Sequence, residues 1–275
     1  MPAFVRHFKF SSNSAKIHSV KISAVIIAFN EEQKIADAIK SVLWADEVLL
    51  IDSESTDATV QIATDLGARV IVQPWLGFSG QKQFGVAAAR NDWILSLDAD
   101  ERVSDHLRSE IVDLCTDSEL KVDGCRIPRL TYYMGRAIKH SGWYPDRQLR
   151  LFDRQKGQWN GRLIHESVSM KPNTKVNNLT GQILHFSIDG PEHHHKMIGE
   201  RYAPMAAEHM RRSGIKTSRL RIAISGPAAF FRSYVLKAGF LDGFPGFCIA
   251  KFAAYHAFLK HLLLLQMQQV DHEKK

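Results

Sequence analysis

Apolar runs alternate with amphipathic segments through the first hundred residues of the chain. Short runs of β-branched and other apolar residues predict buried strands at residues 22–29, 48–51, 69–72 and 93–97. Apolar residues at helical spacing predict helices near residues 35–43, 60–66 and 82–90. Because strands that alternate with helices are typical of βαβ units, we expect an α/β fold with a mostly parallel sheet.

Three of the four predicted strands end in polar clusters. These clusters occupy residues 30–32, 52–57 and 98–101. The carboxyl ends of parallel strands lie on one edge of a sheet, where α/β proteins bind their ligands. Asp98 and Asp100 are one residue apart, so the turn can direct both carboxylates to one point, as a site for Mg²⁺ or Mn²⁺ completed by substrate phosphates requires. The alternative is a solvated acidic turn before a helix that Ser104 caps.

The second half of the chain is less regular. A strand is predicted at residues 127–133, and a polar segment at residues 144–150 follows Trp143. Aromatic, arginine and carboxylate side chains together suit a sugar pocket, and an ordinary turn between strands is the alternative. From residue 192 onward the chain is predicted to be helical. His193, His194 and His195 are adjacent, a spacing that does not suit metal ligands on a helix, and we expect a structural role for His185.

Composition narrows the class of protein. The 275 residues are 45% hydrophobic and carry a net charge of +7, which indicates a folded protein with an anionic partner: nucleic acid, nucleotide phosphates or an anionic membrane surface. Cys115, Cys125 and Cys248 form no C-x-x-C pair, so we expect buried, reduced thiols. Residues 1–20 contain no apolar core of a signal peptide and are expected to be a flexible leader.

The polar clusters resemble the motifs of a known family. Ala-Phe-Asn-Glu-Glu at 28–32, Ile-Asp-Ser-Glu-Ser-Thr-Asp at 51–57 and Leu-Asp-Ala-Asp-Glu at 97–101 resemble, in order and spacing, the opening motif, the D-D-G-S-T-D segment and the D-x-D of inverting family 2 glycosyltransferases. Residues 142–146, 150–152 and 165–166 resemble one subgroup, the bacterial lipopolysaccharide inner-core glucosyltransferases that add a β-1,4-linked glucose to heptose.

The resemblance implies a domain organisation. It implies a GT-A fold at residues 21–189, with a nucleotide-sugar half to about residue 125 and an acceptor half after it. A helical region at residues 190–275 follows. Its basic segment at residues 211–221 and its apolar helix at residues 247–267 fit either an interfacial anchor on an anionic leaflet or a subdomain that packs on the sheet.

The resemblance also implies roles for the residues that bind the donor. Ala28 and Glu31 would line the uridine pocket, Asp52 would contact the base, Asp98 would face the ribose, and Asp100 would hold Mg²⁺ or Mn²⁺ on the diphosphate. Glu54 stands where the family often has glycine. Lys82, expected to open a helix, either reaches the ribose or a phosphate or is a solvated lysine. Arg150 either offsets charge on the leaving diphosphate or forms a plain salt bridge.

An inverting transfer needs a base that takes the proton of the acceptor hydroxyl. Asp146 and Glu166 are the candidates. Glu166 is preferred, because it ends the apolar segment at residues 163–165, whereas Asp146 is expected in a loop after Pro145.

These observations predict a metal-dependent inverting glycosyltransferase. The expected donor is UDP-glucose and the expected acceptor a lipid-linked saccharide such as lipopolysaccharide core, at the inner face of the cytoplasmic membrane. Transfer to polyprenyl phosphate or to another glycan is an alternative within the class. A nucleotidyltransferase would need a glycine-rich basic loop after the first strand. A nucleic-acid binder would need basic and aromatic residues on the sheet. The acidic edge argues against both, so we expect no nucleic-acid partner.

Overall fold

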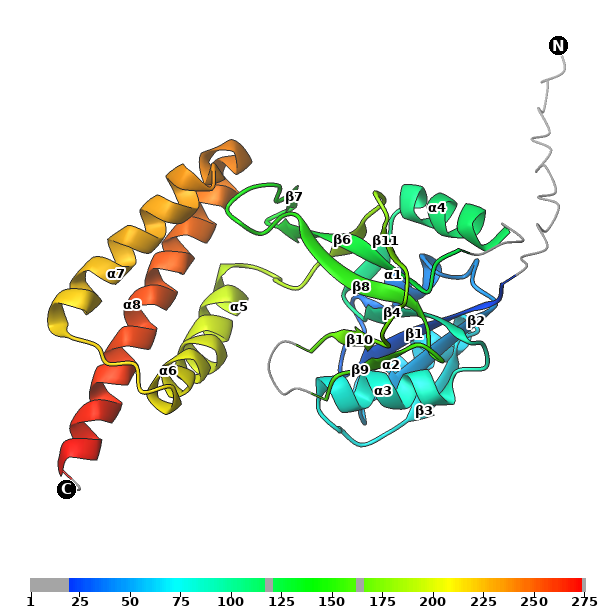
Figure 1. The fold of residues 1–275 in the computed structure, drawn as a ribbon, viewed down its shortest axis with the longest axis horizontal. Helices are drawn as coiled ribbons and strands as arrows, with labels where there is room; N and C mark the ends of the chain where they lie inside the picture. Colours follow the sequence, from blue (N-terminus) through cyan, green and yellow to red (C-terminus); the bar gives the residue numbers. More distant parts are fainter. Residues whose placement is uncertain (1–19, 117–120, 162–165, 274–275) are drawn as a thin grey trace, which may run out of the picture.

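The computed structural model describes residues 20–116, 121–161 and 166–273. An α/β part comes first and a helical part follows it, and the two lie side by side (Figure 1). The predicted leader lies outside the described residues, apart from Val20.

Within the described residues, ten strands form one sheet. Its strands are β1 (Ile22–Ala28), β2 (Glu47–Asp52), β3 (Arg69–Val72), β4 (Trp93–Asp98), β5 (Glu101–Val103), β6 (Gly124–Tyr133), β7 (Arg136–Ala137), β8 (Asp146–Asp153), β11 (Val176–Asn178) and β12 (Ile183–His185). Their order is β3-β2-β1-β4-β8-β6-β12-β5, with β7 and β11 also paired to β6. A separate antiparallel pair consists of β9 (Gly157–Trp159) and β10 (Val168–Met170).

The parallel core of this sheet is the part that the apolar runs predicted. β1 pairs in parallel with β2 and β4, and β2 pairs in parallel with β3. The register sets Ala28 opposite Asp52, and Ile27 opposite Asp98. The polar clusters that follow these strands therefore meet at one edge. In Figure 1, β1 runs from the side of the N terminus toward the helical part, so this edge faces the helices.

Helices cover the sheet and form the second part. They are α1 (Ile35–Lys40), α2 (Thr59–Asp65), α3 (Phe78–Ala88), α4 (Asp105–Thr116), α5 (Pro191–Lys196), α6 (Ala203–Arg212), α7 (Arg219–Phe231) and α8 (Gly243–Glu273), with π-helical turns η1 (Met197–Tyr202) and η2 (Arg232–Leu236) and the 3₁₀ turn η3 (Gly239–Asp242). The prediction that Lys82 opens a helix is wrong. Gly77, with φ +81°, makes the turn, and α3 begins directly after it.

Apolar side chains on both faces of β1 and β2 build the core. One cluster packs the sheet against α1 and α4, and the other packs it against α3. Gly85 of α3 lets the helix approach the sheet closely, since a Cβ there would lie 2.5 Å from Cγ1 of Val25. Each large aliphatic side chain buried in this way stabilises the fold by about 1.5–3 kcal/mol. Cys115 and Cys125 lie in the same core, and burial raises the pKa of each thiol to about 12.

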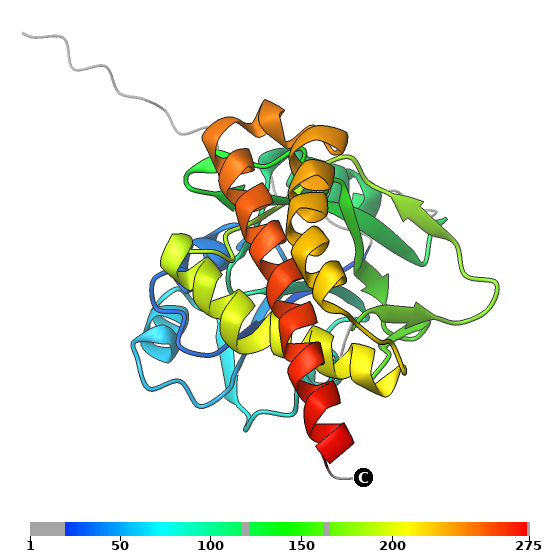
Figure 2. The same ribbon diagram turned by 90° about the vertical axis from the view of Figure 1, so that its left-hand side faces the viewer.

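The helical part docks on the segment that includes β7 and the loop after it. Tyr133, Ile138 and Ile249 form a buried apolar cluster between the two parts. The carboxylate of Asp242 accepts hydrogen bonds from the backbone N–H groups of Lys139 and His140 at 3.1 and 2.9 Å. Figure 2 shows α6, α7 and α8 in front of the α/β part, with α7 and α8 packed side by side.

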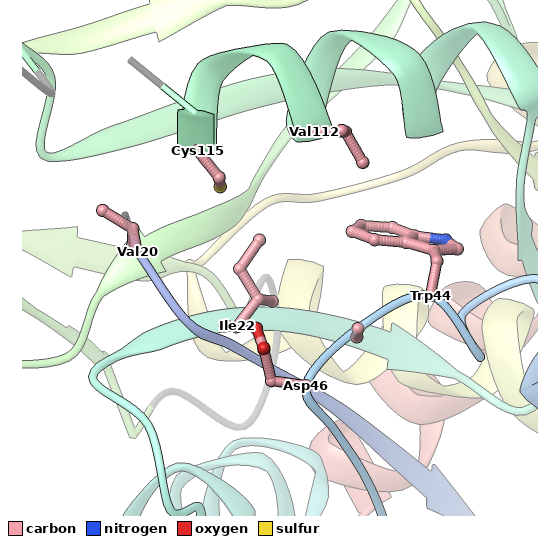
Figure 3. A pocket seen from close by; sticks show the side chains of 7 residues that line it. Val20, Ile22, Trp44, Asp46, Val112 and Cys115 are labelled. Atoms are coloured by element: carbon pink, nitrogen blue, oxygen red, sulfur yellow. Dashed lines mark hydrogen bonds between the residues drawn. The ribbon is translucent and has the colours of Figure 1, made fainter. Parts of the chain in front are cut away.

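A small hollow lies at the opposite end of β1 from the polar clusters. Ile22, Trp44, Asp46 and Cys115 are among the residues that line it (Figure 3). Asp46 Oδ2 accepts a hydrogen bond from the N–H of Ile22 at 2.8 Å, and the hollow has no room for a water molecule. This hollow is therefore too small for a ligand, and the acidic edge at the other end of β1 is the candidate ligand site.

Candidate active site

The first two polar clusters are bonded to each other. The N–H of Asn30 donates to Ser55 Oγ at 2.8 Å, and the N–H of Glu31 donates to Thr59 Oγ1 at 2.8 Å. The N–H of Glu32 donates to Asp57 Oδ2 at 3.1 Å. These bonds satisfy backbone donors at the end of β1 and hold the two loops in one arrangement.

Asp52 is fixed at the end of β2. Its side chain is 1% exposed, and it accepts hydrogen bonds from the N–H and the hydroxyl of Ser55 at 2.8 and 2.5 Å. Glu54, two residues on, has φ +64°, the conformation that glycine adopts most readily. The loop thus keeps a glycine-type backbone although a glutamate occupies the position.

Asp98 sits between two cations. Lys82 Nζ lies 2.9 Å from Asp98 Oδ1, and Arg150 Nη2 lies 3.3 Å from Asp98 Oδ2. Burial raises the pKa of Asp98, but the charges of Lys82 and Arg150 outweigh it and hold that pKa well below its usual range. Asp98 is therefore ionised at neutral pH, with both oxygens oriented by buried side chains.

A second set of charges lies behind Asp98. Glu101 is fully buried, and its Oε1 is 3.0 Å from Arg150 Nη2 and 3.3 Å from Arg129 Nη1. Arg129 continues the chain of charges, because its Nη2 lies 2.7 Å from Asp146 Oδ2. No function was predicted for Glu101 or Arg129 from the sequence. The signal for Glu101 was its place directly after the D-x-D, whereas nothing local marked Arg129.

Asp100 lies beside a histidine. His185 Nε2 is 3.4 Å from Asp100 Oδ2, and the Nδ1 of the same ring is 3.3 Å from Thr131 Oγ1. The backbone pairing of β12 with β5 brings His185 there, and the N–H of Phe186 donates to the carbonyl of Asp100 at 2.9 Å. A structural role was expected for His185 from the sequence, and its place beside Asp100 was not predicted.

The donor set at Asp100 fits a divalent cation. The pKa of Glu31 is raised, mainly by burial and also by the nearby charge of Asp100, although Lys34 lowers it in part. The carboxylates of Glu31 and Asp100 therefore lie close enough to repel each other. Among the described residues no group of three or more histidine, cysteine or carboxylate side chains could hold a metal alone. The Asp100 carboxylate suits Mn²⁺ or Mg²⁺ when phosphate oxygens complete the shell, and the imidazole beside it fits Mn²⁺ better than Mg²⁺, which prefers oxygen ligands.

The two candidate bases differ in their partners. Both oxygens of Asp146 are occupied, by Arg129 and by Gln148 Nε2, which donates to Oδ1 at 2.6 Å. Asp146 is the first residue of β8, so the expectation that it lies in a loop is wrong. Glu166 has Lys82 Nζ at 3.8 Å from its Oε1. The apolar segment at residues 163–165, on which the preference for Glu166 rested, lies outside the described residues.

The fold and this edge together define a class of enzyme. A mostly parallel sheet with aspartates at the carboxyl ends of β2 and β4, followed by antiparallel strands that carry further charged groups, is a GT-A fold. Residues 23–189 match the sequence profile of Glycosyl transferase family 2, and the chain belongs to this family of glycosyltransferases.

Two bacterial sequence relatives match along most of the chain, and one solved structure matches less than half of it. An uncharacterized glycosyltransferase of Rickettsia typhi is 33% identical over 251 residues, which cover 87% of this chain and 85% of the relative. The lipopolysaccharide core biosynthesis glycosyltransferase LpsC of Rhizobium meliloti is 32% identical over 250 residues, which cover 88% of this chain and 91% of LpsC. Glucosyl-3-phosphoglycerate synthase from Mycobacterium tuberculosis, solved with Mn²⁺, UDP-glucose and phosphoglyceric acid, is 27% identical over 44% of this chain and 46% of that chain, with a TM-score of 0.34.

Proposed function

We propose that the chain transfers glucose with inversion from UDP-glucose to a lipid-linked saccharide of the lipopolysaccharide core. The observation that carries the proposal is the register of β1, β2 and β4, which brings Asp52, Asp98 and Asp100 to one edge. The similarity to LpsC, which is named for lipopolysaccharide core biosynthesis, supports the acceptor. A nucleotidyltransferase is not supported, because β1 is followed by Asn30, Glu31 and Glu32 rather than by a glycine-rich basic loop.

The proposed donor site follows the edge of the sheet. Ala28, Glu31 and Asp52 would hold the uridine, and Asp98 would accept hydrogen bonds from the ribose hydroxyls. Asp100 and His185 would hold Mn²⁺ or Mg²⁺. When bound there, the cation supplies positive charge against the donor diphosphate.

Buried cations keep this site ordered. Lys82 is 2% exposed and Arg150 is 4% exposed, so each faces carboxylates instead of solvent. We infer that they position Asp98 and Glu101, and that Lys82 also links Asp98 to Glu166, since its Nζ lies within 3.8 Å of both carboxylates. The ring of Trp159 lies 4.8 Å from this Nζ and adds a cation–π contact.

Glu166 is the proposed base. It would take the proton of the acceptor hydroxyl as the glycosidic bond forms, and within the described part of the chain its carboxylate has fewer competing donors than that of Asp146. Asp146, held by Arg129 and Gln148, is better arranged to position a hydroxyl than to move a proton. The hydroxyl gains an acceptor at the moment when it becomes acidic, which lowers the barrier to transfer.

The helical part is proposed to bind the anionic surface of the membrane. Exposed apolar side chains follow one side of α7 and continue into η2 and η3: Leu220, Ile224, Phe231, Val235, Leu236, Phe240 and Leu241. Exposed Arg232, Lys237 and Lys251 lie among them, and Lys251 Nζ is 5.3 Å from the ring of Phe230. Cations beside exposed aliphatic and aromatic groups are what an interfacial anchor needs.

The apolar helix expected at residues 247–267 lies within α8 and is only partly buried. Ile249, Ala250, Ala257 and Leu264 of α8 are buried, whereas Phe247, Phe258 and Leu262 are exposed, and 28% of the apolar stretch is buried. The stretch Gly239–Val270 is nevertheless long and apolar enough to cross a membrane, with a mean hydropathy of 1.3.

A screen of nucleotide-sugars tests the proposal. Unfolding temperature is measured with UDP-glucose, UDP-galactose, GDP-mannose and ADP-heptose, each with Mn²⁺ and with EDTA. A donor at about 100 times its Kd stabilises the fold by about 2.7 kcal/mol, so UDP-glucose with Mn²⁺ should give the largest rise. A larger rise in unfolding temperature with another nucleotide-sugar would identify that compound as the donor in place of UDP-glucose. The same unfolding temperature with all four nucleotide-sugars would refute the donor site.

A further inference from the structure

A basic groove lies between β6, β8 and β10. Its volume is about 560 Å³, and its polar walls are Arg126, Arg147, Gln148, Ser167, Lys171 and Thr174. The rest of the lining is aliphatic. The groove therefore combines cations and hydrogen-bond donors with apolar side chains, as a site for a charged sugar does.

The charge of this groove is not balanced from within. No carboxylate is among its described lining residues, and none of Arg126, Arg147 and Lys171 forms an ion pair within the described part of the chain. Arg147 Nη1 donates to the carbonyl of Leu179 at 2.9 Å, which anchors the guanidinium and leaves its other donors free for a ligand. Arg129 and Arg150, on the same two strands, are both paired with carboxylates.

Guanidinium groups bind phosphates and carboxylates through two parallel hydrogen bonds. Like charges held close together repel one another, so an anion between these side chains is favoured by all of them. The arrangement therefore selects an anion of the size of a phosphate or a carboxylate group.

The groove opens next to both candidate bases. Gln148 forms part of its wall and donates to Asp146, and Ser167 directly follows Glu166 in the chain. Arg147 follows Asp146 in β8, and successive side chains of a strand point to opposite faces, so the groove is linked to the candidate bases through Gln148 and Ser167. A saccharide whose hydroxyl reaches Glu166 can thus place its neighbouring group in the groove.

We propose that the basic groove is an acceptor subsite that binds a phosphate or carboxylate group of the acceptor saccharide. The identification of the ligand as the acceptor rests on the proposed function, whereas the affinity for an acidic sugar does not. Neither Asp98 nor Asp100 of the proposed donor site lines the groove, so the two sites share neither of these aspartates.

Direct binding tests the groove without any transfer reaction. The full chain is titrated calorimetrically with glucose 6-phosphate, glucuronate and glucose. We expect glucose 6-phosphate and glucuronate to bind and glucose not to bind. The tighter ligand of the first two shows whether the groove prefers a phosphate or a carboxylate group. Arg147→Gln, Arg126→Gln and Lys171→Gln should each weaken binding about tenfold, because each removes a charge-assisted contact. Arg108→Gln, an exposed arginine of α4, is the matched control and should bind as the wild type does.

Three outcomes would overturn the subsite: no binding of either acidic sugar, equal binding by the groove variants and the wild type, or displacement of the sugar by UDP. In transfer assays the same variants should raise the KM of the acceptor and leave the KM of the donor unchanged. If an acidic sugar binds at the groove but no glucosyl transfer is measured, the acidic-sugar site stands and the proposed function is rejected.

Discussion

Acidification should weaken the attachment of the helical part to the α/β part at His194. This residue of α5 is 7% exposed, its ring centroid lies 4.1 Å from that of Phe252, and its Nδ1 lies 3.3 Å from Tyr133 Oη. Burial among these rings, with a smaller effect of His193, lowers the pKa of His194 to about 4. The folded protein therefore keeps this imidazole neutral under mildly acidic conditions.

The sign and size of the effect follow from proton linkage. Above pH 6.5, the usual pKa of histidine, the ring is neutral in both the folded and the unfolded chain and costs nothing. Below it the unfolded chain takes up a proton that the folded chain refuses until about pH 4, so stability is lost as the pH falls through this window. The loss amounts to about 2 kcal/mol at pH 5 and about 3 kcal/mol at pH 4.

Urea unfolding at pH 7 and pH 5 measures this loss. The wild type should lose about 2 kcal/mol more between the two pH values than His194→Gln does. Burial also lowers the pKa values of His256 and His261, but these residues titrate alike in both proteins and cancel. His106→Gln, whose side chain is 67% exposed, should behave as the wild type. An equal loss in the wild type and in His194→Gln would refute the reasoning.

Further substitutions test three other parts of the structure. Glu166→Gln should keep donor affinity and lose at least about 10²-fold in kcat, whereas Asp146→Asn should raise the acceptor KM; the reverse pattern would exchange the two roles. Leu236→Ser with Phe240→Ser should reduce sedimentation with anionic vesicles, and Val72→Ser, on the α/β part, should not; equal sedimentation would reject the proposed surface. Arg150→Met should lower the free energy of unfolding by about 2 kcal/mol or more in urea titrations, because Asp98 and Glu101 lose a shared buried cation and each keeps one partner, Lys82 or Arg129. Arg212→Met, at an exposed ion pair, should cost about 1 kcal/mol or less, and equal costs would contradict the buried network.

The donor half of the fold could be predicted because its signals are local. Strands buried on both faces appear as continuous apolar runs, and β1, β2, β3 and β4 were each placed within one residue at either end. Gly77 and Gly80 looked alike in the sequence, yet Gly77 has a positive φ while Gly80 lies within α3, which moved Lys82 from the start of the helix into its buried interior. Which of the two glycines makes the turn depends on its backbone conformation, and the residue types alone do not show that conformation.

The acceptor half could not be predicted to the same depth, because its strands are short and its contacts are distant. His185 lies beside Asp100 through the pairing of β12 with β5, although 85 positions separate them in the chain. Arg150 is separated by 52 positions from the Asp98 carboxylate that it contacts. Strands of three residues, such as β9 and β10, carry too little hydrophobic pattern to be placed from sequence.

The central claim is that Asp100 holds a divalent cation for glycosyl transfer. The most direct test measures transfer of labelled glucose from UDP-glucose to lipopolysaccharide core oligosaccharide, in Mn²⁺ and in EDTA, for the wild type, Asp100→Asn and the exposed control Asp105→Asn. We expect transfer by the wild type and by Asp105→Asn in Mn²⁺, loss in EDTA with recovery when metal is restored, and no transfer by a folded Asp100→Asn. Full activity in EDTA, or wild-type activity in Asp100→Asn, would contradict the claim.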